Sequence, residues 1–304
     1  MKQTLVIGST VVDVIVSIPH LPSTGEDINV TAQTQRLGGC AYNVSNMLRL
    51  TGTPYTLCSP VGSGLYGDFV AERLAQLGIP CFIRLENVPN GCCYCIVEND
   101  GERTFLSQHG AEYVFSRSWM HRIDSESADS VYICGLEIEE PTGSEIILYL
   151  EEHPEYTVFF APGPRISSIP QERLNRIFAL HPVLHLNDTE AVGFTKRAAV
   201  SEAAAALYEK TGNAVVITQG KDGAFCMDRG RGFSVPGFPA EVADTIGAGD
   251  AHAGSVIAYL KQGFSLEESV RRANRIAAAV VSVNGATLPD GQYAAAVQNF
   301  VPAL

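Results

Sequence analysis

The segment Asp244-Thr245-Ile246-Gly247-Ala248-Gly249-Asp250 places small residues and two carboxylates directly before a stretch with helical character, Ala251–Gln262. Small residues let a ligand approach the backbone, and the amides of residues 247–250 would converge at the positive end of the helix dipole. Such a pocket suits a phosphoryl group that carries developing charge. The Asp250 carboxylate can reach a hydroxyl beside that group, as general-base-assisted phosphoryl transfer requires. The alternative is an Asp that only caps a glycine turn.

A second glycine turn also opens a predicted helix, at Gly38-Gly39-Cys40-Ala41-Tyr42-Asn43. Paired glycines permit close approach, and the Asn43 amide offers a donor and an acceptor to hydroxyl groups. Asp13, at the end of the first predicted strand, is a further hydroxyl acceptor. Each of these signals is weak when taken alone.

Two polar segments follow apolar strands later in the chain. Asn187-Asp188-Thr189-Glu190 comes after Val183–Leu186, and a carboxylate with an amide there suits a hydrated Mg²⁺. Thr218-Gln219-Gly220-Lys221-Asp222-Gly223 comes after the strand Ala214–Thr218, at the kind of strand end where open α/β sheets bind nucleotides. Taken in isolation, either segment is better interpreted as a loop or a helix cap.

A competing motif is the GxGxxG of residues 62–67, between a predicted strand Tyr55–Val61 and a predicted helix Asp68–Leu77. Glu86 closes the next apolar run at roughly the spacing of a ribose-binding acid, so the motif favours an NAD(P)-dependent oxidoreductase. Pro60 before the glycines and an apparent βα unit ahead of the motif weigh against that interpretation.

Continuous apolar strands alternate with helical stretches for most of the chain, which predicts a mostly parallel sheet with helices on both faces. Two segments, 13–37 and 91–110, interrupt this rhythm. The second contains the hairpin turn Asn99-Asp100-Gly101-Glu102. We expect these segments to form a small β-sheet lid, and residues 1–12, 38–90 and 111–304 to form the α/β core.

The net charge is −12, from 21 basic and 33 acidic residues in a chain of 304. This balance weighs against a nucleic-acid or anionic-membrane partner, because both bind a positive surface. No apolar run reaches the roughly 18 residues of a membrane span, so a cytoplasmic protein is expected. The eight cysteines, including Cys92, Cys93 and Cys95, show no ligand spacing and are predicted to be free thiols.

Taken together and in this order, the motifs resemble the ribokinase-like (PfkB) family of carbohydrate and nucleoside kinases across nearly the whole chain. The N-terminal signature is matched by residues 38–45 and the C-terminal signature by residues 244–250. Residues 61–67 resemble the family's VGxDxxG segment, with Gly64 where the family often has Asp, which explains the glycines without a dinucleotide.

The resemblance implies a role for each matching residue. Asp250 corresponds to the catalytic base, and Gly247, Ala248 and Gly249 to the anion hole. Hydroxyl groups of the acceptor would be held by Asp13, Gly39, Asn43 and Glu139. Asn187 and Glu190 match the motif that acts on Mg²⁺ through water. Thr218, Gly220 and Gly223 match the nucleotide loop, and Asn274 a position beside the adenine.

Many family members bind a monovalent cation such as K⁺, and the resemblance implies Asp244 and the carbonyl of Ile246 as its first ligands. The implied function is Mg·ATP-dependent phosphorylation of a primary hydroxyl on a small sugar: a pentose, a ketohexose or a sugar acid. A nucleoside kinase of the pseudouridine or adenosine/inosine type is the alternative.

The lid would decide among these acceptors, and Cys93, Cys95, Phe105, Ser107 and His109 are candidates to line the acceptor site. An open small sheet also has exposed edges, so we expect a homodimer through the lid. Val30, Cys93, Cys95 and Phe105 are the candidates for the shared face.

Overall fold

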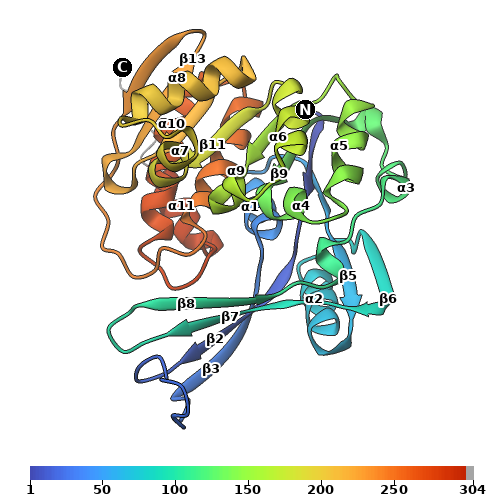
Figure 1. The fold of residues 1–304 in the computed structure, drawn as a ribbon, viewed down its shortest axis with the longest axis vertical. Coiled ribbons are helices and arrows are strands. Elements are labelled where there is room, and N and C mark those ends of the chain that lie inside the picture. The colour runs from blue at the N-terminus through green and yellow to red at the C-terminus, as the bar shows by residue number, and fades with distance from the viewer. Residues whose placement is uncertain (299–304) are drawn as a thin grey trace.

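The computed structural model describes residues 1–298 and is built around one eight-stranded sheet (Figure 1). The strand order is β14-β13-β12-β11-β10-β9-β1-β4. The six strands β12, β11, β10, β9, β1 and β4 pair in parallel with one another. The β13–β14 hairpin adds two antiparallel strands at the β12 edge. The bounds are β1 Gln3–Ile7, β4 Tyr55–Cys58, β9 Ala128–Cys134, β10 Thr157–Ala161, β11 Val183–Asn187, β12 Val215–Thr218, β13 Ala224–Asp228 and β14 Arg231–Val235.

Helices cover both faces of this sheet, because successive side chains of a buried strand point to opposite faces. On β9, Ile133 belongs to the core under one set of helices and Tyr132 to the core under the other. The first set is α5 Gly143–Glu151, α6 Gln171–Ala179, α7 Asp188–Thr195 and α8 Val200–Thr211. The second set includes α1 Cys40–Leu50, α9 Ala248–Lys261 and α10 Leu266–Val280. This architecture confirms the predicted α/β fold with a mostly parallel sheet.

A four-stranded sheet of order β3-β2-β7-β8 projects from the main body (Figure 1). Its strands are β2 Val11–Ser17, β3 Ala32–Gly38, β7 Cys92–Val97 and β8 Arg103–Gln108. β2 pairs with β7 in parallel, while β2–β3 and β7–β8 are antiparallel. The β7–β8 turn passes through Gly101 at φ 90°, a conformation that glycine adopts without strain. We call these four strands the small sheet.

The predicted strand Tyr55–Val61 is in fact two strands. Only β4 belongs to the main sheet, while β5 (Pro60–Ser63) pairs with β6 (Ile83–Pro89) in a separate two-stranded sheet. The following helix, α2, spans Gly64–Gln76 and so begins four residues before the expected Asp68. The remaining helices are α3 Arg117–Met120, α4 Gly135–Glu139 and α11 Asp290–Val297.

Two of the three glycines in the GxGxxG motif, Gly62 and Gly67, are explained by packing. A Cβ on Gly67 would lie 1.9 Å from the Gly62 carbonyl oxygen, and one on Gly62 would lie 2.4 Å from the Asn90 nitrogen. The Gly62 N–H also donates to Asn90 Oδ1 at 2.9 Å. These glycines hold α2 against β5 at a sheet separate from the main one, so the dinucleotide interpretation has no support in the structure.

Two further sequence expectations concern membranes and metals. Within residues 1–298, no helix combines the length and the hydrophobicity needed to cross a bilayer. All eight cysteines are free, and the described part of the chain contains no cluster of three or more His, Cys, Asp or Glu side chains suited to a metal ion. The Cys92–Cys95 segment simply alternates across β7 of the small sheet.

Candidate active site

A cavity of about 630 Å³ lies where the small sheet meets the main body. It is lined by residues far apart in the sequence, among them Asp13 of β2, Gly39 and Asn43 at the start of α1, and Asp250 of α9. The structure therefore brings the predicted base, Asp250, together with three of the four residues that were predicted to hold acceptor hydroxyls. These polar side chains share the cavity with apolar ones such as Phe69 and Phe105, a combination found in many small-molecule sites.

A second cavity, of about 240 Å³, lies over the carboxyl ends of β11 and β12. Asn187, Glu190, Thr218 and Gly249 line it, and these residues come from three segments of the chain. Asp250 lines both cavities. A side chain shared in this way can contact a ligand on either side, which is the geometry that transfer of a group between two bound molecules needs.

The Asp250 carboxylate is held in a defined position and in a poorly hydrated environment. Asn43 Nδ2 donates to Asp250 Oδ2 at 2.8 Å, which joins the first turns of α1 and α9. Burial raises the pKa of Asp250 to about 6, and the nearby charge of Glu137 adds to the rise, while hydrogen bonds from Asn43 and Cys40 oppose it. Burial and the charge of Asp250 likewise raise the pKa of Asp13 to about 6. A carboxylate with such a pKa is a stronger base than an exposed one and is still ionised at neutral pH.

The start of α9 places its first backbone amides beside this carboxylate, although that of Ala248 makes a long contact of 3.4 Å with the Thr245 carbonyl. Gly247 precedes the helix at φ 73°, and a Cβ there would lie 2.5 Å from that of Ala286, so only glycine fits. The first N–H groups of a helix have no intrahelical partner and carry its positive dipole end. Ala248, Gly249 and Asp250 open α9 at this point, so the region fits an anion next to Asp250.

Asn187 and Glu190 form a reciprocal cap at the start of α7. The Glu190 N–H donates to Asn187 Oδ1 at 2.8 Å, and the Asn187 N–H donates to Glu190 Oε2 at 3.0 Å. Burial raises the pKa of Glu190, with the charge of Asp188 adding to the rise and the Asn187 hydrogen bond opposing it. One partly buried carboxylate that faces a water-accessible cavity fits a hydrated Mg²⁺, which retains most of its water ligands.

The predicted nucleotide residues are partly separated. Thr218 ends β12 and lines the second cavity, while Gly220 and Gly223 shape the turn that follows it. Asn274, on α10, is buried and donates from Nδ2 to the carbonyls of Val235 and Pro236 at 3.1 and 3.0 Å. Asn274 Oδ1 is then the acceptor for His252 Nε2 at 2.9 Å, so its side chain is engaged inside the fold.

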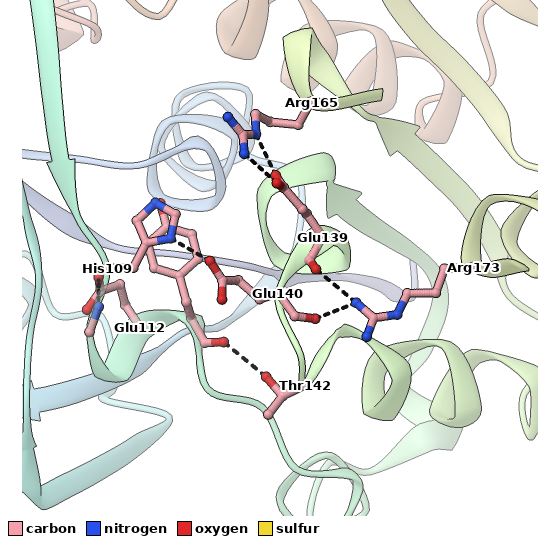
Figure 2. Close-up of polar contacts among 9 residues, drawn as sticks. His109, Glu112, Glu139, Glu140, Thr142, Arg165 and Arg173 are labelled. Atoms are coloured by element: carbon pink, nitrogen blue, oxygen red, sulfur yellow. Dashed lines mark hydrogen bonds and ion pairs between the residues drawn. The ribbon is translucent and has the colours of Figure 1, made fainter. Parts of the chain in front are cut away.

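Glu139 does not line the acceptor cavity. It pairs with Arg165 through two short contacts, and Figure 2 shows its carboxylate turned to that guanidinium. Glu137, two positions earlier in α4, lines neither cavity, but its charge contributes to the raised pKa of Asp250. Its Oε1 accepts from the Ser9 N–H at 2.7 Å, and its side chain is fully buried. The sequence of residues 137–140 does not indicate which of its acidic side chains turns inward, because the short helix α4 sets their directions.

The residues expected to line the acceptor from the small sheet are mostly in place. Cys93, Cys95, Phe105 and Ser107 line the larger cavity, since alternate residues of β7 and β8 share that face. His109 instead stacks on Tyr113 with ring centroids 3.9 Å apart, and its Nδ1 bonds to Glu140 at 2.6 Å (Figure 2). Three of the four candidates for a dimer contact therefore face the cavity.

The predicted cation ligand Asp244 already has partners for both carboxylate oxygens. Oδ1 contacts the Arg103 guanidinium and accepts from the Ile246 N–H at 2.8 Å, and Oδ2 accepts from the Gly285 N–H at 2.9 Å. A guanidinium in direct contact with this carboxylate repels a second cation there. The donor set therefore does not fit the monovalent cation that the sequence resemblance implied.

Comparison with known proteins gives a consistent result over the whole chain. The chain is 35% identical over 288 residues to the "Uncharacterized sugar kinase YegV" of Escherichia coli, covering 93% of this chain and 90% of that protein. It is 27% identical over 293 residues to the ribokinase of Mus musculus, covering 92% and 89%. The crystal structure of ribokinase from Thermotoga maritima superposes with a TM-score of 0.84 at 22% identity, covering 98% of this chain and all of that one.

A family model described as pfkB family carbohydrate kinase matches residues 1–291, which include both glycine turns, the small sheet and Asp250. Proteins of this family are ATP-dependent phosphotransferases that act on sugar hydroxyls. With that match and a relative 35% identical over nearly its full length, the chain belongs to the pfkB family of carbohydrate kinases.

Proposed function

We propose that this enzyme transfers the γ-phosphoryl group of Mg·ATP to a primary hydroxyl of a small sugar: a pentose, a ketohexose or a sugar acid. The observation that carries the proposal is the position of Asp250 between the two cavities. The larger cavity would hold the acceptor and the smaller one the phosphates. Neighbours of the same fold support this division, since one from Escherichia coli is in complex with ATP and Mg²⁺ and the Arabidopsis thaliana ribokinase with ribose and ATP.

Asp250 acts as the general base. The Asn43 hydrogen bond fixes its carboxylate toward the acceptor hydroxyl, and burial gives it a pKa of about 6. Taking the hydroxyl proton as the oxygen attacks phosphorus avoids a positively charged oxygen in the transition state. The amides at the start of α9 stabilise the negative charge on the transferring group. These two effects come from adjacent residues of one turn, so base and anion site are positioned together.

Asn187, Glu190 and Thr218 serve the nucleotide side. Glu190, with Asn187, would hold Mg²⁺ through water ligands, and the bound ion neutralises phosphate charge. Gly220 and Gly223 let the loop after β12 follow the nucleotide closely. Asn274 has an indirect role on the nucleotide side, since its amide holds the backbone at Val235 and Pro236 through two hydrogen bonds.

Asp13 and Asn43 supply the hydroxyl partners that a bare sugar needs, which is why we favour a sugar. A nucleoside is the second candidate because the rings of Phe69 and Phe105 also line the cavity and offer surfaces for a base. A nucleoside kinase of Burkholderia thailandensis in complex with inosine shares the fold.

The test is ADP formation over a panel of pentoses, ketohexoses, sugar acids and nucleosides, with wild type and Asp250→Asn in parallel. We expect a sugar to give the highest kcat/KM and the variant to be nearly inactive. Phe105→Ala separates the candidates, because it should raise KM strongly for a stacked nucleoside and little for a sugar. A nucleoside preferred by a hundredfold would contradict the sugar assignment.

We also propose a cytoplasmic homodimer that pairs through the small sheet. Val30, in the loop before β3, and Phe105 and Leu106, on opposite faces of β8, expose large apolar side chains, at 51, 52 and 56%. β3 and β8 are the edge strands of this sheet, and exposed edges are commonly covered by a partner, which a second copy would supply symmetrically.

A further inference from the structure

Asp244 is a buried carboxylate whose charge must be balanced within the fold. Its side chain is 8% exposed, and that of Arg103, which contacts its Oδ1, is 20% exposed. Two backbone amides, of Ile246 and Gly285, complete its hydrogen bonds. A buried carboxylate is costly unless a cation pairs with it, so removal of Arg103 would leave a strong site for another cation.

The loop that Asp244 holds is the loop that shapes the anion site. The N–H groups of Ala243 and Asp244 both donate to the Val281 carbonyl, at 2.8 and 3.1 Å. Gly285 is bound to the Asp244 carboxylate, and the neighbouring Ala286 packs against Gly247 so closely that no Cβ fits there. The position of Gly247, and with it the first amides of α9, therefore depends on the Asp244 carboxylate.

Arg103 reaches this loop from the small sheet. It begins β8, and Phe105, two residues on, lines the acceptor cavity, so both side chains lie on the same face of the strand. From the opposite edge strand, β3, Arg36 Nη1 donates to the Asn284 carbonyl at 2.9 Å. Both edge strands of the small sheet thus contact the residues that position Gly247: Arg103 contacts Asp244, and Arg36 contacts Asn284.

We infer that Arg103 is a positioning residue that supplies, from the small sheet, the positive charge that Asp244 requires, in place of a bound monovalent cation. The enzyme is then independent of K⁺, and the geometry of the anion site depends on the position of the small sheet against the loop of Asp244. This inference rests on the proposed role of Asp250 and the amides at residues 247–249. It makes the acceptor side of the site responsible for ordering the phosphate side.

The test compares wild type, Arg103→Met, Arg103→Lys and Arg36→Met in choline chloride, with K⁺ replacing choline at constant ionic strength. Methionine keeps the apolar stem and removes the charge, while lysine keeps a charge. Arg36→Met is the matched control, because it removes a guanidinium from the same sheet that binds a carbonyl and not a carboxylate. The readouts are the Tm and the kcat with the best acceptor of the panel.

Wild type should respond to neither K⁺ nor Na⁺. The kcat of Arg103→Met in choline should be roughly tenfold or more below that of wild type, because the amides that stabilise the transition state are no longer held in position. K⁺ or low, non-denaturing guanidinium should restore most of that loss and raise the Tm. Arg103→Lys should stay active without K⁺, and Arg36→Met should show no specific cation response.

Several-fold activation of wild type by K⁺, or a K⁺-specific rise in its Tm, would overturn the inference even if Arg103→Met does not fold. Full activity of Arg103→Met in choline would overturn it too, as would a folded variant that no cation rescues. The Tm comparison needs no acceptor, so it separates this inference from the proposed function, which fails instead if Asp250→Asn stays active.

Discussion

Replacing Asp250 by Asn should make the protein more stable while it abolishes activity. In the folded protein burial moves the pKa of Asp250 from 3.8 to about 6. At about 1.4 kcal/mol per pKa unit, keeping this group ionised at neutral pH reduces the free energy of unfolding by about 3 kcal/mol. An Asn at this position carries no charge, and its carbonyl can still accept from Asn43 Nδ2. Burying the ionised Asp250 carboxylate therefore destabilises the folded protein, and the Asn variant is free of this destabilisation.

The pH dependence gives the sign of this effect. Between pH 3.8 and about 6 the unfolded chain has lost the Asp250 proton and the folded protein retains it, so wild type loses stability as pH rises through this window. The difference between variant and wild type should be near zero at the acid end and grow to roughly 2–3 kcal/mol above pH 6.

Urea unfolding at several pH values measures the difference in free energy, and kcat should fall by about 10²–10⁴ in the same preparation. Asp27→Asn, an exposed carboxylate on the small sheet's connecting loop, is the control and should show no such pH-dependent gain. The reasoning is refuted if Asp250→Asn is no more stable than wild type at pH 8, or if its advantage does not change with pH.

The remaining predictions concern the pH profile, the metal, the nucleotide loop and assembly. With a base of pKa about 6, kcat/KM should fall about tenfold per unit of pH below that value, and a profile flat down to about pH 5 would count against Asp250. Glu190→Gln should raise the Mg²⁺ concentration for half-maximal activity by about 10-fold or more and leave the acceptor KM unchanged, whereas a change confined to the acceptor KM would contradict its place. Gly223→Ala should lower the Tm and weaken ATP binding in calorimetry, because its Cβ would lie 2.1 Å from the Val235 carbonyl oxygen at a φ of 93°; unaltered values would show that the loop can adapt. Sedimentation velocity at micromolar concentration should show a dimer, and a monomer with and without substrate would rule out pairing through the small sheet.

The sequence by itself determined the layers of this protein and the centre of its site. Apolar strands between amphipathic helices specify a parallel sheet covered on both faces. This could be predicted because the spacing of apolar residues within each segment is a local property of the sequence. The two glycine turns were readable for the same reason: a turn that opens a helix is defined by consecutive residues, and Asp250 lies inside one of them. Glu139 shows the limit: it pairs with Arg165 outside the larger cavity, because a short helix decides which of several nearby acids points inward.

Only the tertiary structure decided which distant groups meet. Asn43 and Asp250 are 207 positions apart, and Arg103 and Asp244 are 141 apart, so neither pair leaves a trace in local sequence. Likewise, only the structure shows that Gly67 approaches Gly62 closely, so that these glycines of the GxGxxG motif serve packing and not dinucleotide binding. The raised pKa of Asp250 and the Arg103 charge at Asp244 follow from burial and proximity, which depend on how the small sheet is placed against the main sheet. The chain's periodicity specifies the elements, whereas the electrostatics of the site arise only when those elements are packed together.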